Sequence, residues 1–101
     1  MSRLGFDTLD VQELSIGMAQ VTIYTRPFCG YCARALALLA EKGAQVNEIE
    51  AGFDPAKRSE MVARSGGATF PQIFVGDRHV GGCDDLIALD RRGELDGMLS
   101  A

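Results

Sequence analysis

The sequence predicts an α/β fold in which helices flank a four-stranded mixed sheet. Three observations lead to this prediction. Apolar and β-branched residues at 21–25 precede a helix-forming segment, a second strand-like segment follows at 45–50, and a β-hairpin pattern occupies residues 73–80. A strand, a helix and a strand in succession imply a right-handed parallel crossover, and the hairpin adds antiparallel strands to the same sheet.

The domain is expected to span residues 20–101, after an N-terminal extension of residues 1–19. The extension mixes apolar with acidic residues, a pattern that predicts a short amphipathic helix or a disordered segment. Met18 lies close to the first strand and is an alternative start of the natural chain. No function is assigned to the extension.

The first strand and helix are marked by their composition and their ends. Residues 21–25 are rich in β-branched and aromatic side chains, and Pro27 ends the strand because proline cannot continue a hydrogen-bonded ladder. Residues 33–42 are strong helix formers, and Gly43 stands where a left-handed helix cap is usual. A strand and a helix are therefore predicted with a short loop between them.

The second helix is predicted from its capping residues. Asp54 is a favourable N-cap, Pro55 suits the first helical position, and the helical pattern runs to Gly66. This helix follows the strand at 45–50, whose alternation of apolar and polar residues is imperfect.

The hairpin and the last helix complete the domain. Gly76-Asp77 forms a two-residue turn between strands, and Pro71 before the first of them is either cis in a tight turn or trans at the start of an edge strand. Gly81-Gly82 then opens a helix that ends at Gly93, and residues 94–99 add a short helical turn. A helix start flanked by glycines offers unpaired N–H groups to an anion such as a carboxylate.

Cys29 and Cys32 form a Cys-x-x-Cys pair between the first strand and the first helix. Cys29 is expected at the helix N-terminus, where unpaired N–H groups and the helix dipole favour a negative sulfur. It is therefore predicted to be the attacking thiolate, and Arg26 adds a positive charge nearby. Cys32, one turn further into the helix, suits a resolving thiol that cleaves a mixed disulfide.

A Cys-x-x-Cys pair can also be half of a structural zinc site, for which His79 and Cys83 are the remaining candidate ligands. Zinc knuckles lie in tight turns and not between a buried strand and a helix, so redox chemistry is favoured. His79 is instead expected to be a surface residue of its strand.

Length, charge and cysteine content exclude several classes of protein. The 101 residues suffice for one domain with one core. The net charge of −4, with acidic and basic residues interspersed, predicts neither a nucleic-acid nor a membrane partner, and no apolar run has the length of a membrane span. Three cysteines do not fit a disulfide framework and the N-terminus lacks a signal-peptide core, so a cytoplasmic protein is expected.

Three stretches of the chain together resemble the glutaredoxin family, in particular the small bacterial glutaredoxins. They are Thr25–Cys32, Thr69–Phe74 and Gly81–Leu86, in family order and spacing. The resemblance implies a thioredoxin-like fold and an enzyme of cell redox homeostasis, a thiol–disulfide oxidoreductase to which glutathione supplies electrons. Its implied partners are glutathione, glutathionylated proteins and proteins that contain disulfides.

The resemblance also implies roles for single residues. Cys29 is similar to the family's nucleophile and Cys32 to its resolving thiol. The backbone of Phe70 would pair with the cysteinyl part of glutathione, and Arg26, in the place of the usual lysine, would pair with the glycine carboxylate. The implied glutathione-binding residues are Arg26, Tyr31, Phe70, Pro71, Gly82, Cys83 and Asp84.

Two positions depart from the family pattern. Residues 66–68 are Gly-Gly-Ala where many relatives carry an arginine that binds the glycine carboxylate, and Arg64 is a candidate substitute. Gly30 stands where dithiol members commonly have proline, and relatives with glycine or serine there include dimers that share a [2Fe–2S] cluster. The alternative function is therefore a cluster-bridged dimer with Cys29 as iron ligand, acting as an iron–sulfur carrier or redox sensor. The leading expectation is a monomer without a resident metal.

Overall fold

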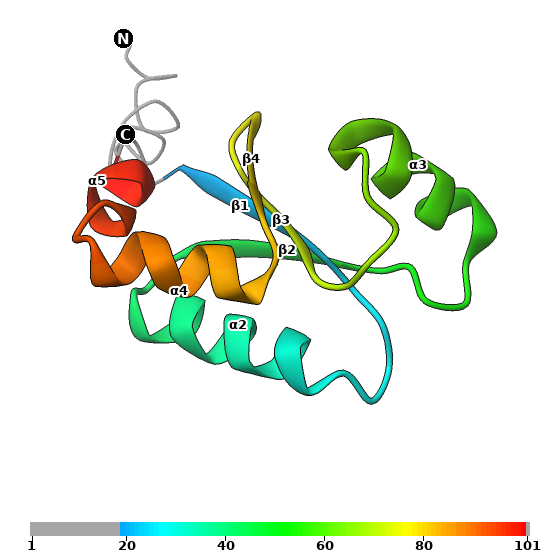
Figure 1. The fold of residues 1–101 in the computed structure, drawn as a ribbon, viewed down its shortest axis with the longest axis horizontal. Helices are drawn as coiled ribbons and strands as arrows, with labels where there is room; N and C mark the ends of the chain where they lie inside the picture. The colour runs from blue at the N-terminus through cyan, green and yellow to red at the C-terminus, as the bar shows by residue number, and fades with distance from the viewer. Residues whose placement is uncertain (1–18, 101) are drawn as a thin grey trace, which may run out of the picture.

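The computed structural model describes residues 19–100, so residues 1–18 of the predicted extension at 1–19 lie outside the described residues, as does Ala101. The elements are β1 (Gln20–Thr25), α2 (Gly30–Glu41), β2 (Gln45–Glu50), α3 (Pro55–Ser65), β3 (Gln72–Val75), β4 (Arg78–Gly81), α4 (Cys83–Arg91) and α5 (Leu95–Ser100). The four strands form one sheet in the order β2-β1-β3-β4. Helices α2 and α4 lie side by side on one side of the sheet and α3 on the other (Figure 1). The predicted α/β fold is confirmed.

Strand β1 lies inside the sheet and pairs with both neighbours. It is parallel to β2, through the crossover helix α2, and antiparallel to β3, which continues through a hairpin into β4. Strand β2 forms one edge of the sheet, and its side chains are exposed apart from the half-buried Ile49. The imperfect alternation of β2 follows from this exposure, because a strand that is barely covered needs no apolar face.

The main core lies between the sheet and helices α2, α4 and α5. Helix α2 contributes Ala35 and Leu39, which are spaced four residues apart and therefore lie on one helix face. The left-handed conformation of Gly43, with a φ of 69°, follows the end of α2, as predicted. The buried members of this core are Val21, Ile23, Ala35, Leu39, Ile73, Val75, Cys83, Leu86, Leu89, Leu95 and Leu99.

A smaller cluster fastens α3 to the other side of the sheet. Met61 is the buried residue of α3, and it packs with Tyr24, Ala51 and Phe74. The Asp54 carboxylate caps the helix by accepting from the N–H groups at positions 56 and 57, over 3.1 and 3.2 Å. The predicted capping residue therefore acts as a cap.

The chain between β3 and α4 adopts the backbone geometry that its prolines and glycines allow. The Phe70–Pro71 peptide is cis and β3 lies between β1 and β4, so the edge-strand alternative for Pro71 is wrong. The β3–β4 pairing shifts register after Ile73, and Gly81 then turns the chain into α4 with a φ of 116°. A Cβ atom at Gly81 would collide with the Asp85 carboxylate, so this turn requires glycine.

Lys42, just after α2, connects three helices. Its Nζ atom lies 2.7 Å from an Asp90 carboxylate oxygen on α4 and 2.9 Å from an Asp96 carboxylate oxygen on α5. None of the helices that the structure describes combines the length and apolar character needed to cross a membrane.

Candidate functional site

Cys29 and Cys32 lie together at the N-terminus of α2, as predicted. Cys29 is the N-cap residue, and the Cys32 backbone N–H donates to its Sγ atom over 3.1 Å. Both thiols are free; Cys29 is 8% exposed and Cys32 3%. A sulfur that accepts a backbone N–H at a helix N-terminus is stabilised as the thiolate, because the donor and the helix dipole both favour negative charge there.

The pKa of Cys32 shows that the two thiols differ. Burial raises the pKa of Cys32 from the ordinary thiol value of 9.0 to about 11, with further contributions from its hydrogen bond to Cys29 and from repulsion by that sulfur. Cys32 therefore carries its proton near neutral pH. The Cys32 thiol stands next to the Cys29 sulfur, which accepts a backbone N–H at the helix cap.

One side of this cysteine pair opens into a hollow of about 430 Å³. Arg26 and Glu48 bring opposite charges to its wall, and Phe28 brings an aromatic ring. The Arg26 guanidinium donates from Nη1 to the Pro27 carbonyl oxygen over 3.2 Å. We refer to this depression as the Phe28 hollow; its lining residues are Thr25, Arg26, Phe28, Cys29, Gly30, Cys32, Ala33, Leu36 and Glu48.

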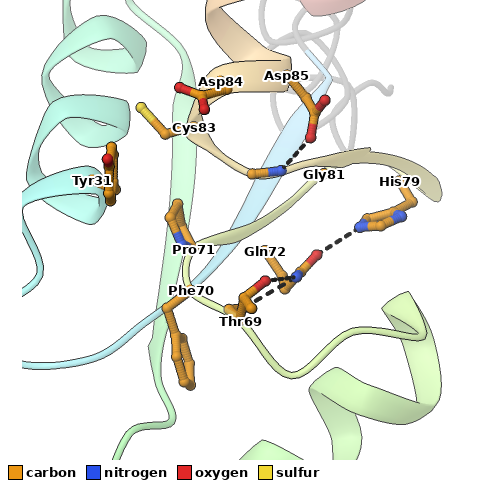
Figure 2. Close-up of a pocket in the computed structure, with 11 residues that line it drawn as sticks. Tyr31, Thr69, Phe70, Pro71, Gln72, His79, Gly81, Cys83, Asp84 and Asp85 are labelled. Carbon is orange, nitrogen blue, oxygen red and sulfur yellow. Dashed lines mark hydrogen bonds between the residues drawn. The ribbon is translucent and has the colours of Figure 1, made fainter.

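A separate groove of about 350 Å³ contains most of the residues predicted to bind glutathione (Figure 2). Six of the seven predicted residues line it, and Arg26 lies on the Phe28 hollow instead. Tyr31 comes from α2, Phe70 and Pro71 from the loop before β3, and the others from the start of α4. The groove lining is Tyr31, Thr69, Phe70, Pro71, Gln72, His79, Gly81, Gly82, Cys83, Asp84 and Asp85.

The start of α4 presents backbone N–H groups and carboxylates to this groove. Gly82 is the N-cap residue and has no side chain to accept from the first turn of the helix. The Asp85 carboxylate instead turns back and accepts from the Gly82 N–H over 2.9 Å. Figure 2 shows the Cys83 sulfur pointing toward the side of the groove that carries Tyr31. Burial raises the pKa of Cys83, which suits a packing role for that thiol.

Sequence reasoning missed the side chain that holds the loop before β3. Gln72 is buried, and its Nε2 atom donates to the carbonyl oxygen and to Oγ1 of Thr69, each over 3.1 Å. His79 Nε2 donates to Gln72 Oε1 over 2.8 Å (Figure 2). The sequence feature that could have indicated this role is an amide side chain at the start of an otherwise apolar strand.

Gly67, one of the family departures, gives this amide its room. A Cβ atom at Gly67 would lie 2.9 Å from Gln72 Nε2, closer than a side chain ordinarily comes. The candidate substitute Arg64 is engaged elsewhere, since its Nη1 donates to the Tyr24 hydroxyl over 2.9 Å and its guanidinium lies 4.2 Å from the centre of the Phe74 ring. Arg64 is not part of the groove lining.

The residues of the zinc alternative are not gathered into one site. Within residues 19–100, no three His, Cys, Asp or Glu side chains are grouped so that they could hold a metal ion. His79 is exposed on its strand, with its ring stacked on Phe74 at 4.9 Å between centres. The prediction of a surface histidine on the strand agrees with this position.

A comparison with known families identifies the chain. The family model described as Glutaredoxin matches residues 21–80, which include the cysteine pair, the loop before β3 and the hairpin. The chain belongs to the glutaredoxin family. Glutaredoxin 3 of Escherichia coli (strain K12) is 55% identical over 82 residues, which are 81% of this chain and 99% of that protein.

Solved glutaredoxin structures share the fold. The solution structure of glutaredoxin from Brucella melitensis is 62% identical, with a TM-score of 0.73 over 83% of this chain and 91% of that one. A structure described as metal binding of glutaredoxins is 59% identical, with a TM-score of 0.65 over 85% of this chain and 94% of that one. A buckwheat glutaredoxin–glutathione complex is 26% identical, with a TM-score of 0.72 over 98% of this chain and 93% of that one.

Family membership makes this glutaredoxin a thiol–disulfide oxidoreductase with a thioredoxin-like fold. The expected family, fold and general activity are therefore confirmed. The Cys-x-x-Cys pair at the start of α2 is of the type that this chemistry uses.

Proposed function

We propose that this glutaredoxin reduces glutathione mixed disulfides and protein disulfides with electrons from glutathione. The observation that carries the proposal is the position of Cys29, whose sulfur accepts a backbone N–H at a helix N-terminus beside a groove suited to glutathione. Tyr31, two residues after Cys29 at the start of the same helix, lines this groove. The proposed compartment is the cytoplasm, where glutathione keeps thiols reduced.

The groove offers complementary groups along the length of a glutathione molecule. The main chain before Pro71 has an N–H and a carbonyl for the cysteinyl residue, in the manner that the family resemblance implies. The N–H groups at Cys83 and Asp84 suit the γ-glutamyl carboxylate, and the Asp84 carboxylate suits its ammonium group. Buckwheat glutaredoxin, a 26% identical relative, has been solved in complex with glutathione, and this relationship supports the assignment.

The proposed reaction begins with the Cys29 thiolate attacking the glutathione sulfur of a mixed disulfide. A bond forms between Cys29 Sγ and that sulfur, the original disulfide bond breaks, and the substrate leaves as a thiolate that takes up a proton. A second glutathione, as thiolate, then attacks the glutathione sulfur bound to Cys29. Oxidised glutathione leaves and Cys29 returns to the thiolate, so two electrons have passed from glutathione to the substrate.

Cys32 is needed when the substrate is a protein disulfide. Cys29 first attacks one sulfur of the substrate disulfide, which forms a mixed disulfide and releases the other sulfur as a thiolate. Cys32 then loses its proton and attacks Cys29 Sγ, which forms the Cys29–Cys32 disulfide and releases the second substrate thiol. Two glutathione molecules reduce that disulfide and leave as oxidised glutathione.

Parallel measurements on two cysteine variants test the proposal. Glutathionylated mercaptoethanol and a protein disulfide serve as substrates, with glutathione, NADPH and glutathione reductase. Cys29→Ser should abolish both reactions, because no thiolate remains to attack. Cys32→Ser should keep most of the mixed-disulfide activity and lose reduction of the protein disulfide. Full activity of both variants would contradict the assigned roles.

The [2Fe–2S] dimer is retained as a second candidate function. The 59% identical structure described as metal binding of glutaredoxins supports it. Cys29 of each subunit would be an iron ligand together with glutathione.

Reconstitution with iron, sulfide and glutathione tests the cluster. Visible absorption bands and a dimeric mass should appear together and should be absent in Cys29→Ser. Gly30→Pro introduces the proline that dithiol relatives commonly carry at this position. The variant should still fold, because Gly30 is the first residue of α2 and proline is tolerated there. Reconstituted wild type without visible bands would eliminate this candidate.

A further inference from the structure

Phe28, the residue before Cys29, places a large apolar side chain fully in solvent. It is 99% exposed, more than Phe53, Tyr31, Val62 and Val46, the other exposed large apolar residues of the described chain. Exposed apolar area is unfavourable in water, and this ring contributes no buried apolar surface that would stabilise the fold. The exposure therefore lacks a structural explanation.

The backbone of Phe28 is also strained. Its φ is 57°, which makes it the single non-glycine residue with positive φ among residues 19–100. The left-handed region is unfavourable for a residue with a Cβ atom, and glycine or asparagine adopts it more readily. A phenylalanine at such a position has neither local preference nor burial in its favour, and strain of this kind gathers at functional sites.

The ring lines a different depression from the groove that holds six of the seven predicted glutathione-binding residues. Phe28 lines the hollow that also contains Cys29, whereas the groove is lined from Tyr31 onward and does not include Phe28. If glutathione occupies the groove, the substrate thiol that leaves the glutathione sulfur under attack by Cys29 must depart through a different opening. The Phe28 hollow is the opening next to that sulfur.

We propose that Phe28 is a specificity-determining residue whose ring contacts an apolar side chain next to the reacting cysteine of protein substrates. The inference rests on the proposed function, because that reaction brings a substrate cysteine to Cys29. Since Phe28 precedes Cys29 in the chain, a polypeptide passes close to the ring when its cysteine forms the disulfide that Cys29 attacks. An apolar neighbour of the substrate cysteine removes ring surface from water, whereas a polar neighbour stays solvated.

The test uses two glutathionylated peptides that differ only in the residue before cysteine, leucine in one and serine in the other. The wild-type enzyme should prefer the leucine peptide by about tenfold in kcat/KM, the effect of burying part of a phenylalanine ring. Phe28→Ala should reduce this ratio to about one. Phe28→Leu should retain a preference of about threefold, because it remains apolar.

Control measurements distinguish a failure of this inference from a failure of the proposed function on which it rests. Val62→Ala, at an exposed apolar residue of α3, should keep the wild-type ratio. If the wild type fails to reduce glutathionylated mercaptoethanol, the proposed function is wrong and this inference falls with it. If the wild type reduces that substrate but shows no preference, or if Phe28→Ala keeps the preference, the inference alone is wrong. A decrease in sedimenting mass in Phe28→Ala with an unchanged ratio would assign the ring to self-association and also overturn it.

Discussion

At the residue scale, the chemistry of this glutaredoxin depends on a difference between two cysteines one helical turn apart. Cys29 is the N-cap residue and its sulfur accepts a backbone N–H, whereas Cys32 is buried inside the first turn. Burial disfavours a charged sulfur, so Cys32 retains its proton to high pH. The two thiols therefore have different surroundings, one at the helix cap with a backbone N–H on its sulfur and the other buried with its proton held.

The raised pKa of Cys32 predicts a pH dependence of stability. Its pKa is about 11 in the folded protein and near 9.0 in an unfolded chain, so the folded state holds this proton more tightly. The tighter binding of the Cys32 proton contributes its full amount to the free energy of unfolding below about pH 9. This contribution is lost as pH rises toward 11.

Denaturant unfolding of the reduced protein checks this sign. The stability difference between wild type and Cys32→Ala should be constant from pH 6 to about pH 8 and should then shrink as pH rises. Cys83→Ala provides a second buried thiol for comparison, since burial also raises the pKa of Cys83. A wild-type advantage over Cys32→Ala that grows above pH 9 would show that the shift has the opposite sign.

At the element scale, the three longest helices begin in three different ways. A sulfur caps α2, the Asp54 carboxylate caps α3, and Gly82 leaves the first turn of α4 without a cap from its own side chain. Carboxylate caps stabilise a helix directly, whereas an uncapped start offers N–H groups to a ligand. Helices α2 and α4 begin in the two proposed functional regions, and neither has a carboxylate as its N-cap.

The carboxylate cap predicts a measurable loss of stability. Asp54→Ala removes the acceptor of two backbone N–H groups and should lower the free energy of unfolding by about 1 kcal/mol. Urea denaturation measures the change, and Asp54→Ser should recover part of it. Lys57→Ala, at an exposed side chain in the same turn, should change stability by less than about 0.5 kcal/mol. Equal stability of Asp54→Ala and Lys57→Ala would exclude a capping contribution.

At the scale of the whole molecule, the sheet is covered unequally. Helices α2, α4 and α5 cover one face with an extended core, whereas the cluster of α3 on the other face contains Met61 and three further buried residues. The loop before β3, which carries Phe70 and Pro71, begins where α3 ends. The attachment of α3 therefore affects one wall of the groove.

Truncation of Met61 tests this dependence. Met61→Ala should lower the free energy of unfolding by about 2–5 kcal/mol, because a fully buried side chain is replaced by a cavity. Met61→Leu keeps the volume and should cost less than about 1.5 kcal/mol. The KM for glutathione should rise in Met61→Ala at temperatures where the protein is still folded. An unchanged KM would show that the groove wall is independent of α3.

The strands, the helices and the cysteine pair could be predicted from the sequence because each depends on neighbours within a few residues. Asp54-Pro55 begins a helix wherever it stands before a helical pattern, and Gly43 ends one. The position of Cys29 at a helix start needs only the strand, the loop and the helix formers around it. The three family stretches contain most of the residues that line the groove.

The order of elements, the family and the cysteine pair at a helix start could therefore be derived from the sequence alone. Three-dimensional packing was needed to show that the Gln72 amide bridges Thr69 and His79, that Arg64 packs on Phe74, and that Arg26 and the groove residues line different depressions. The tertiary structure also decided the cis geometry before Pro71 and the exposure of Phe28. These features depend on strand register, on how helices pack across the sheet and on the rotamers that this packing allows. Spacing along the chain encodes local preference, but not which distant side chains meet or which remain in solvent.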